Sequence, residues 1–165
     1  MTVAPLAVAA ALALAEAAPP RDHQWLYREQ QGDGQPLPHA IFLSWDFARV
    51  IFHGACSRER PDTLELRYFP DPQIGTRNAD GHLALDPVPP IVLRRGEREL
   101  VMETGLIYDS IVGRARITPE LLTLLRPADE TGLGIDAVSE MGEEWDAGTA
   151  EPLYRLAMAC DDPER

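Results

Sequence analysis

Five arginines form the densest group of side chains in this sequence that could bind an anion. They lie around a predicted hairpin and the strand that follows it, at Arg94, Arg95, Arg98, Arg114 and Arg116. Guanidinium groups bind carboxylates and phosphates through paired hydrogen bonds. On one surface they would suit an anionic glycan, a carboxylate ligand or a protein partner. Solvated sheet faces commonly carry the same charges, so the pattern leaves both interpretations open.

The other reactive residue types form no recognisable catalytic or metal-binding motif. All fifteen basic residues are arginine, which excludes Schiff-base chemistry and a P-loop lysine. The four histidines, His23, His39, His53 and His82, have none of the spacings of zinc sites. No serine lies in a Gly-x-Ser-x-Gly elbow. We therefore predict no metal and no cofactor, and we expect His53 to be an ordinary strand residue.

The charge is strongly negative and unevenly spread. The net charge is −12, and residues 127–165 hold eleven acids against two arginines. This balance disfavours nucleic acid as a partner, because it repels the phosphate backbone. A solvated face explains the acidic stretch best, and a basic partner is the alternative. Trp145 lies among these acids, where an aromatic residue either fills the core or forms a platform for a ligand.

The N-terminal residues resemble a secretory signal peptide. Val3 to Ala15 is uncharged and rich in alanine and leucine, and Ala15-Glu16-Ala17 has the small-x-small form of a cleavage site. We therefore expect residues 1–17 to be cleaved and residues 18–165 to form one domain. The missing basic residue before Arg21 leaves a packed alanine-rich helix as the alternative. The apolar run is too short to predict a transmembrane span, which needs roughly 20 residues.

Two cysteines, Cys56 and Cys160, complete the chemistry that the sequence offers. In an exported protein they allow one intramolecular disulfide, with Cys56 at the end of a predicted strand and Cys160 on a predicted C-terminal helix. We expect this disulfide and a periplasmic or secreted protein. The alternative is two free buried thiols in a cytoplasmic protein.

The elements that position these residues are mostly strands. Runs rich in β-branched and aromatic residues, or with apolar and polar residues alternating, predict six strands. They cover residues 41–46, 49–56, 63–69, 91–95, 99–104 and 110–117. Residues 21–40 are predicted to be a loop with one short extended piece, and Pro70 to Pro90 a long irregular loop.

Two helices complete the predicted fold. Thr118-Pro119-Glu120 has the cap, the first-turn proline and the acid that begin a helix, and this helix ends at Arg126 before a proline. A last helix from Thr149 through Cys160 has an apolar stripe. The fold class is therefore α+β and β-rich. We expect a single antiparallel sheet, a sandwich or a partly open barrel of about six strands, with one short late helix and a C-terminal helix.

The spacing of a few features along the chain forms a recognisable layout. They are Trp25, Cys56 at the end of a strand, the strand Leu64 to Phe69, the helix Thr118 to Arg126, and Leu153-Tyr154-Arg155-Leu156 leading to Cys160. In this spacing, and in no specific motif, the chain resembles small Gram-negative envelope proteins, including invasion-associated-locus-B-like and type VI secretion-associated periplasmic proteins. The resemblance implies a non-enzymatic periplasmic role and assigns no functional residue.

Three functional hypotheses follow from the sequence. The first is an exported, non-enzymatic binding or accessory protein of the cell envelope, with a protein or a small anionic molecule as partner. The second is a hydrolase that uses carboxylates between Asp129 and Asp146 with an arginine of the sheet. The third is a cytosolic interaction module whose apolar N-terminal helix, Met1 to Ala18, docks on a partner. The sequence does not define the oligomeric state.

Overall fold

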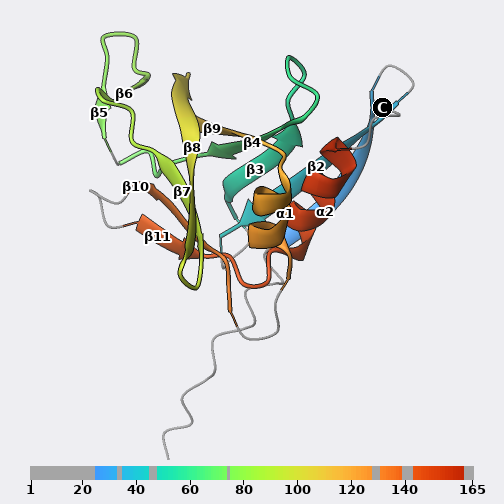
Figure 1. Ribbon diagram of the computed structural model, residues 1–165. Helices are drawn as coiled ribbons and strands as arrows, with labels where there is room; N and C mark the ends of the chain where they lie inside the picture. Colours follow the sequence, from blue (N-terminus) through green and yellow to red (C-terminus); the bar gives the residue numbers. More distant parts are fainter. Residues whose placement is uncertain are drawn as a thin grey trace, which may run out of the picture.

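The computed structural model describes residues 25–32, 35–44, 48–73, 75–127, 131–138 and 143–161. Within these residues the chain forms a nine-stranded sheet, a small two-stranded sheet and two helices (Figure 1). The main sheet contains β1 (Trp25–Gly32), β2 (Gln35–Leu43), β3 (Val50–Cys56), β4 (Thr63–Tyr68), β7 (Ile91–Arg95), β8 (Arg98–Ile107), β9 (Ser110–Arg116), β10 (Gly134–Val138) and β11 (Glu143–Asp146). The small sheet pairs β5 (Thr76–Arg77) with β6 (Leu83–Ala84), and the helices are α1 (Pro119–Leu125) and α2 (Glu151–Cys160). The expected signal peptide lies outside the described residues.

In the central strands of the sheet, buried side chains alternate with side chains on the opposite face. In β4 the side chains of Leu64, Leu66 and Tyr68 are fully buried, while those of Glu65 and Arg67 lie on the other face and are half-buried. The alternation in β9 likewise buries Ile111 and Ala115 on the core side. Successive strand residues point to opposite faces, so the period of two in the sequence fixed which face each residue occupies.

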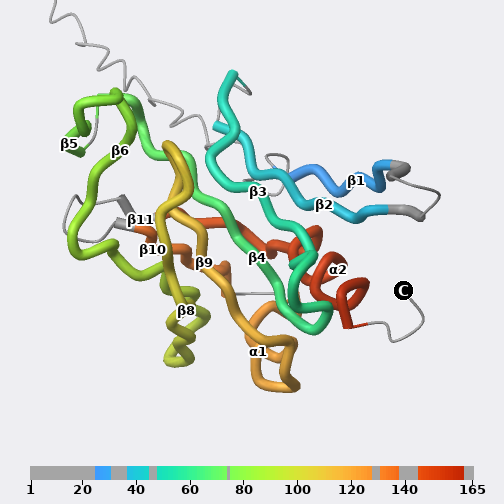
Figure 2. Tube along the Cα trace, turned by 90° about the horizontal axis from the view of Figure 1, so that it is seen from above, coloured from blue at the N-terminus to red at the C-terminus, as the bar shows by residue number. Residues whose placement is uncertain are grey.

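The sheet curves into a half-barrel because β8 pairs with different neighbours along its length. Residues 98–102 of β8 pair with β7, and residues 103–107 pair with β9. The strand order is β1-β2-β3-β4-β9-β8-β7-β10-β11, and every neighbouring pair is antiparallel. Because β8 changes its pairing partner along its length, β7, β10 and β11 lie at an angle to β1–β4 (Figures 1 and 2).

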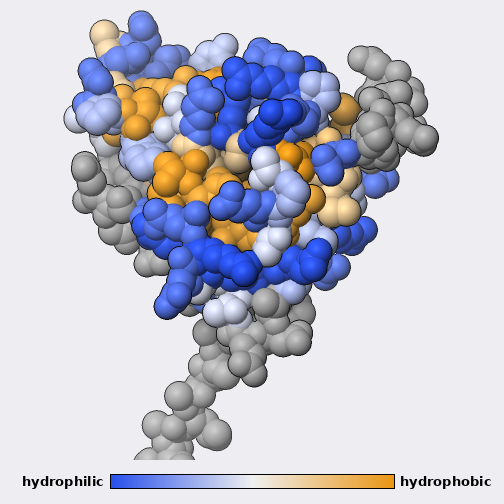
Figure 3. Space-filling model, viewed as in Figure 1, coloured by the Kyte–Doolittle hydropathy of each residue, from blue (hydrophilic) through white to orange (hydrophobic). Residues whose placement is uncertain are grey.

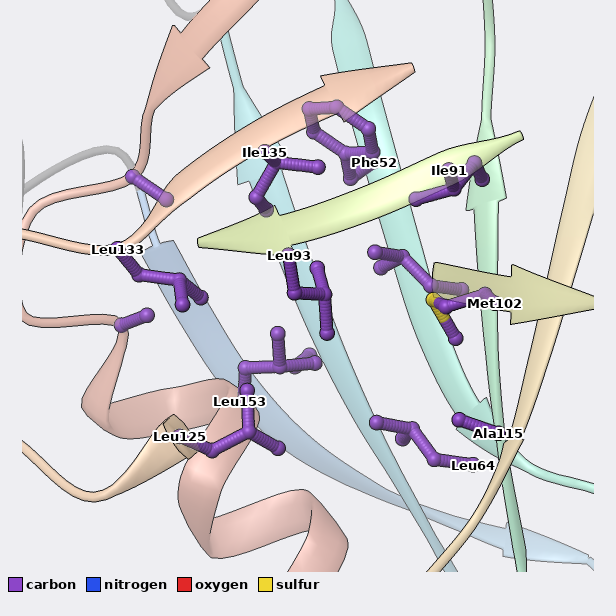
Figure 4. Close-up of a cluster of buried hydrophobic side chains, with 14 of the residues drawn as sticks. Phe52, Leu64, Ile91, Leu93, Met102, Ala115, Leu125, Leu133, Ile135 and Leu153 are labelled. Atoms are coloured by element: carbon purple, nitrogen blue, oxygen red, sulfur yellow. The ribbon is translucent and has the colours of Figure 1, made fainter. Parts of the chain in front are cut away.

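Both helices pack on the same side of the sheet and cover its core. α1 begins as the sequence predicts, with the Thr118 hydroxyl accepting a hydrogen bond from the Leu121 amide. α2 contacts β1, β2, β3 and β4 as well as α1. Figure 4 shows Leu93 of β7 near Leu125 of α1 and Leu153 of α2. Apolar side chains also gather near β7 and β8 on the face seen in Figure 1, with hydrophilic side chains around them (Figure 3).

The N-terminal part contains more structure than the sequence predicts. The expected loop over residues 21–40 is wrong, because β1 and the first half of β2 form a hairpin there. Pro36 and Pro38 suggested a loop, yet both lie in β2. Residues 35–38 of β2 pair with β1 but not with β3, so these prolines lie where one side of the strand has no partner among the described strands. Proline is tolerated in such positions because it has no N–H to donate.

Two further corrections concern the C-terminal third. β10 and β11 lie in the acidic stretch, where no strand was predicted, and they bring the main sheet to nine strands instead of about six. The predicted cap at Thr149 is also wrong. The residue before α2 is Ala150, which has a positive φ of 53° and makes no side-chain cap hydrogen bond. The apolar stripe is confirmed, because Leu153, Leu156, Ala157 and Cys160 are buried.

Candidate functional site

The face of the sheet away from α2 carries a groove, and β3 shows which residues point into it. A Cβ atom placed on Gly54 would lie 2.8 Å from a terminal carbon of Leu156 in α2. Gly54 therefore faces the helix. His53 precedes it in an extended strand, so its side chain points to the opposite face.

Two adjoining hollows form this groove, and His53 lines both. The larger has a volume of about 830 Å³ and is mainly apolar, with Ile41 and Val50 on one side and Phe69 and Pro70 on another. The smaller, of about 400 Å³, is lined mostly by ionisable residues, among them His39, Arg58, Glu65, Arg67 and Arg114. We call the two hollows together the His53 groove. It runs from the β5–β6 hairpin across the ends of β2, β3 and β4.

A pair of histidines lies at the junction of the two hollows. His39 of β2 is opposite Ala55 and His53 of β3 is opposite Ile41, so the two histidines are diagonal neighbours. Their rings stack with centroids 4.9 Å apart, and Nε2 of His53 lies 2.9 Å from Nδ1 of His39. One ring donates this hydrogen bond and the other accepts it, so both rings can be neutral. The Nε2 atom of His39 is buried and has no partner among the described residues.

The surroundings of the pair are positively charged. Burial is the main factor that lowers the pKa of His53, followed by the charges of His39 and Arg67. Burial also lowers the pKa of His39, with a further contribution from the guanidinium of Arg58. A positive potential disfavours the charged form of an imidazole. The same potential would favour a bound anion.

The wall formed by the β5–β6 hairpin is tied to the turn between β8 and β9. The carboxylate of Asp109 accepts hydrogen bonds from the guanidinium of Arg77 and from the backbone amide of Leu83 at 2.9 Å. The hydrogen bond from Leu83 is the main factor that lowers the pKa of Asp109. Beside it, Tyr108 has a positive φ of 51° and a side chain that is 76% exposed. A bulky residue in this conformation is uncommon and often marks a functional position.

Two of the five arginines singled out in the sequence have clear structural partners. Arg94 contacts the carboxylates of Glu99 at 2.9 Å and Asp136 at 3.3 Å. Arg95 is buried, and its guanidinium donates to the backbone oxygens of Leu124 at 2.8 Å, Thr131 at 2.7 Å and Thr149 at 2.9 Å. These three acceptors hold the Arg95 guanidinium inside the protein.

The remaining predicted site residues are spread over separate surfaces. Arg98 lies with α1 residues beside the β7–β8 hairpin, and Arg116 pairs with Asp62 at 2.7 Å. Arg114 lines the His53 groove and pairs with Glu65 at 3.2 Å. Trp145 is half-buried and packs edge-on against Phe52. Its role as a platform for a ligand remains a prediction.

The two cysteines are bonded to each other, and two of the predicted acids contact other parts of the protein. Cys56 and Cys160 form a disulfide that joins β3 to the end of α2. Of the acids between residues 129 and 146, Asp136 is 6% exposed and paired with Arg94, and Asp146 accepts a hydrogen bond from the Gly148 amide. The side chains of Asp129, Glu140, Glu143 and Glu144 lie outside the described part.

The described residues contain no group of three or more histidine, cysteine, aspartate or glutamate residues that could hold a metal ion. Neither α1 nor α2 has the length and apolar character of a membrane-spanning segment.

The pairing of His39 with His53 was not predicted from the sequence. Its signal was present in the hairpin formed by β2 and β3, where His39 and His53 fall on the same face. Extending the second strand back through Pro38 would have placed them together. The prolines argued against that extension, and only the one-sided pairing of residues 35–38 explains why it occurs.

Together these features define a disulfide-closed sheet protein, with two helices on one face and a partly cationic groove on the other. No protein-family model and no curated protein matches the sequence. Among solved structures, the crystal structure of invasion associated protein B from Bartonella henselae is similar. The alignment covers 82% of this chain and 92% of that chain, at 14% identity and a TM-score of 0.41. This neighbour belongs to the group that the sequence layout resembles. At this TM-score it carries no argument about function, which therefore rests on the groove.

Proposed function

We propose that this protein is an exported, non-enzymatic binding protein of the bacterial cell envelope and that the His53 groove is its binding surface. The observation that carries the proposal is the larger hollow of about 830 Å³, lined mainly by apolar side chains. Ligand sites are typically hollows of roughly 300–1,000 Å³ with a few polar groups that orient the ligand. Among the described residues, the helices cover the opposite face of the sheet and leave this one open.

The disulfide supports the proposed compartment. Disulfides persist in secreted and periplasmic proteins, whereas cytosolic thiols are kept reduced. The Cys56–Cys160 disulfide anchors the C-terminal helix to β3, the strand that carries His53. Oxidation would therefore stabilise the same strand that forms the groove. The interpretation of residues 1–17 as a signal peptide agrees with this compartment.

The ionisable groups in the groove favour binding over catalysis. His53 has a second imidazole as its hydrogen-bonding partner, and Asp109 is occupied by Arg77 and the Leu83 amide. A general base needs a partner that it deprotonates, and a pKa near the working pH. Burial and nearby positive charge lower the pKa of His53, so its imidazole is mainly neutral at pH 7 and makes its hydrogen bond to His39.

The test combines export with occupancy of the groove. The full chain would be produced in a Gram-negative host and purified from the periplasmic fraction, and its intact mass, thiol content and bound small molecules would be measured by native mass spectrometry. Ile41→Glu would place a charge in the apolar hollow, and Val101→Glu is the matched control on an exposed position of β8, 59% exposed. We expect a shortened, oxidised protein with a bound mass that Ile41→Glu loses and Val101→Glu keeps.

Two results would refute the proposal separately. A cytosolic protein with residue 1 intact and two alkylatable thiols would refute export. A bound mass that is the same in both variants would refute the groove as the binding surface.

A further inference from the structure

The charges of the His53 groove differ in sign from those of the whole protein. Five arginines and three acids line the two hollows, although the chain has a net charge of −12. Three of the arginines already have carboxylate partners, namely Arg49 with Asp71, Arg77 with Asp109 and Arg114 with Glu65. The question is therefore what balances the other two.

Arg58 and Arg67 have no ion pair or side-chain hydrogen bond with any described residue. Arg67 is half-buried on β4, directly opposite His53, and Arg58 is exposed in the turn after β3. Both are near enough to the histidine pair to lower its pKa values. Of the acids in this hollow, Glu65 is taken by Arg114 and Glu59 is exposed. The half-buried charge of Arg67 is costly without a partner, and a bound anion would remove that cost, while the exposed guanidinium of Arg58 is free to reach the same anion.

The apolar hollow begins where this charged region ends. His53 lines both hollows, and beyond it the walls are formed by Ile41, Val50, Phe69 and Pro70. One molecule could therefore contact both regions. Its charged end would lie at Arg58 and Arg67, and its apolar part would extend toward the β5–β6 hairpin.

From this arrangement we infer that the groove binds a single-chain amphiphilic anion, whose carboxylate or phosphate lies between Arg58 and Arg67 and whose apolar chain fills the hollow beside the β5–β6 hairpin. The inference rests on the proposed function, because it names the ligand class of the same groove. The charged head group would bind at the end of the groove that contains these arginines, since guanidinium binds carboxylate and phosphate strongly. The chain selects the other end through burial of apolar surface.

The experiment is titration calorimetry of the purified full chain with probes kept below their critical micelle concentrations. The probes are octanoate, decanoate, dodecanoate and dodecyl phosphate, with dodecyltrimethylammonium, acetate and inorganic phosphate for comparison. We expect affinity to rise about fourfold per methylene, from the burial free energy of that group. Acetate, inorganic phosphate and the cationic amphiphile should bind at least a hundredfold more weakly than dodecanoate.

The variants assign the binding to the groove. Arg67→Gln should weaken dodecanoate binding about tenfold to a hundredfold, as expected for loss of a charged hydrogen bond. Arg58→Gln should weaken it as well. Arg116→Gln is the matched control, because Arg116 is exposed and does not line the groove, and it should stay within twofold of wild type. A melting temperature of Arg67→Gln no lower than that of wild type would show that the loss reflects binding.

Several outcomes would overturn the inference. They are wild-type affinity in Arg67→Gln, equal affinity for the cationic amphiphile, or inorganic phosphate binding as tightly as dodecyl phosphate. Co-sedimentation with phosphatidylglycerol vesicles that Arg67→Gln abolishes would also overturn it, because the surface would then bind a membrane. An exported, oxidised protein that binds none of the anionic probes would refute this inference alone. Binding of dodecanoate by a protein that stays in the cytosol with reduced thiols would instead refute the proposed export.

Discussion

Replacement of Arg95 should be the most destabilising single change among the arginines. Its side chain ends β7 and is 8% exposed, and its guanidinium donates to carbonyls from three separate segments. Leu124 belongs to the last turn of α1, Thr131 precedes β10, and Thr149 precedes α2. One side chain therefore joins both helices and the β10 connection to the sheet. The Leu124 carbonyl is also one of those that a helix leaves unpaired at its C-terminus.

The magnitude follows from the three hydrogen bonds. Each hydrogen bond to a charged group contributes about 1.5–3 kcal/mol, but the values do not add, because removing the arginine also removes the cost of burying its charge. Arg95→Met keeps most of the apolar packing and leaves three carbonyls without their donor, one buried and two partly buried. We expect a loss of about 2–4 kcal/mol, the cost of leaving carbonyl acceptors unpaired less the cost of burying the charge. The melting temperature should fall by roughly 10 °C.

Urea unfolding followed by circular dichroism measures this loss, with the disulfide intact in every sample. Arg95→Lys keeps the charge but cannot reproduce the three-way geometry of the guanidinium, so it should fall between wild type and Arg95→Met. Arg98→Met is the matched control on the same hairpin. Its side chain is exposed, so the change should stay within about 0.5 kcal/mol. The reasoning is wrong if Arg95→Met costs less than about 1 kcal/mol or no more than Arg98→Met.

Three further predictions concern other parts of the fold. Cys56→Ala with Cys160→Ala opens a loop spanning 104 positions and should cost about 2–5 kcal/mol in urea unfolding; an unfolding midpoint that dithiothreitol leaves unchanged would contradict this. Gly54→Ala should cost about 1–3 kcal/mol, because its Cβ would overlap Leu156, whereas Gly105→Ala has open space and should be nearly neutral; equal unfolding curves for the two would count against the packing argument. Folding lowers the pKa values of both histidines, so below pH 6.5 the unfolded chain binds more protons and stability should fall from that pH downward. His53→Gln should flatten that decline between about pH 7 and pH 5 in urea titrations, and parallel curves would exclude the histidine pair as its source.

The sequence predicted the elements in which a local pattern and the tertiary contacts agree. The alternation in β4 and β9 fixed their buried faces, and Thr118-Pro119-Glu120 located the start of α1. The hairpin at Gly96 formed as expected, with a positive φ of 58°. The strands β10 and β11 were missed because their acids resemble a solvated connection. Asp136 is accommodated in β10 only because Arg94, on the neighbouring strand, pairs with it.

The candidate site was harder to predict from the sequence than the fold, for a related reason. Arginines close in sequence suggested a shared patch. Arg94 and Arg95 are adjacent at the end of β7, however, and they contact different partners. The histidines that do meet are 14 positions apart and belong to different strands. Their contact depends on the register between β2 and β3, which the sequence leaves open until the strand limits are known.

Strand β3 connects the stabilising face of the protein to its groove. On one side, Gly54 lets α2 approach closely, and the disulfide of Cys56 holds the end of that helix. On the other side, His53 lies between the charged and apolar hollows.

Because neighbouring strand residues face opposite ways, changes on the helix side should lower stability without altering the chemistry of the groove. Changes at Arg67 should alter the chemistry of the groove without lowering stability, since its side chain makes no hydrogen bond or ion pair with another described residue. A cycle that combines Arg67→Gln with Gly54→Ala should therefore give additive effects, with one acting on ligand affinity and the other on unfolding. Strong coupling between the two would show that the groove depends on the packing of α2.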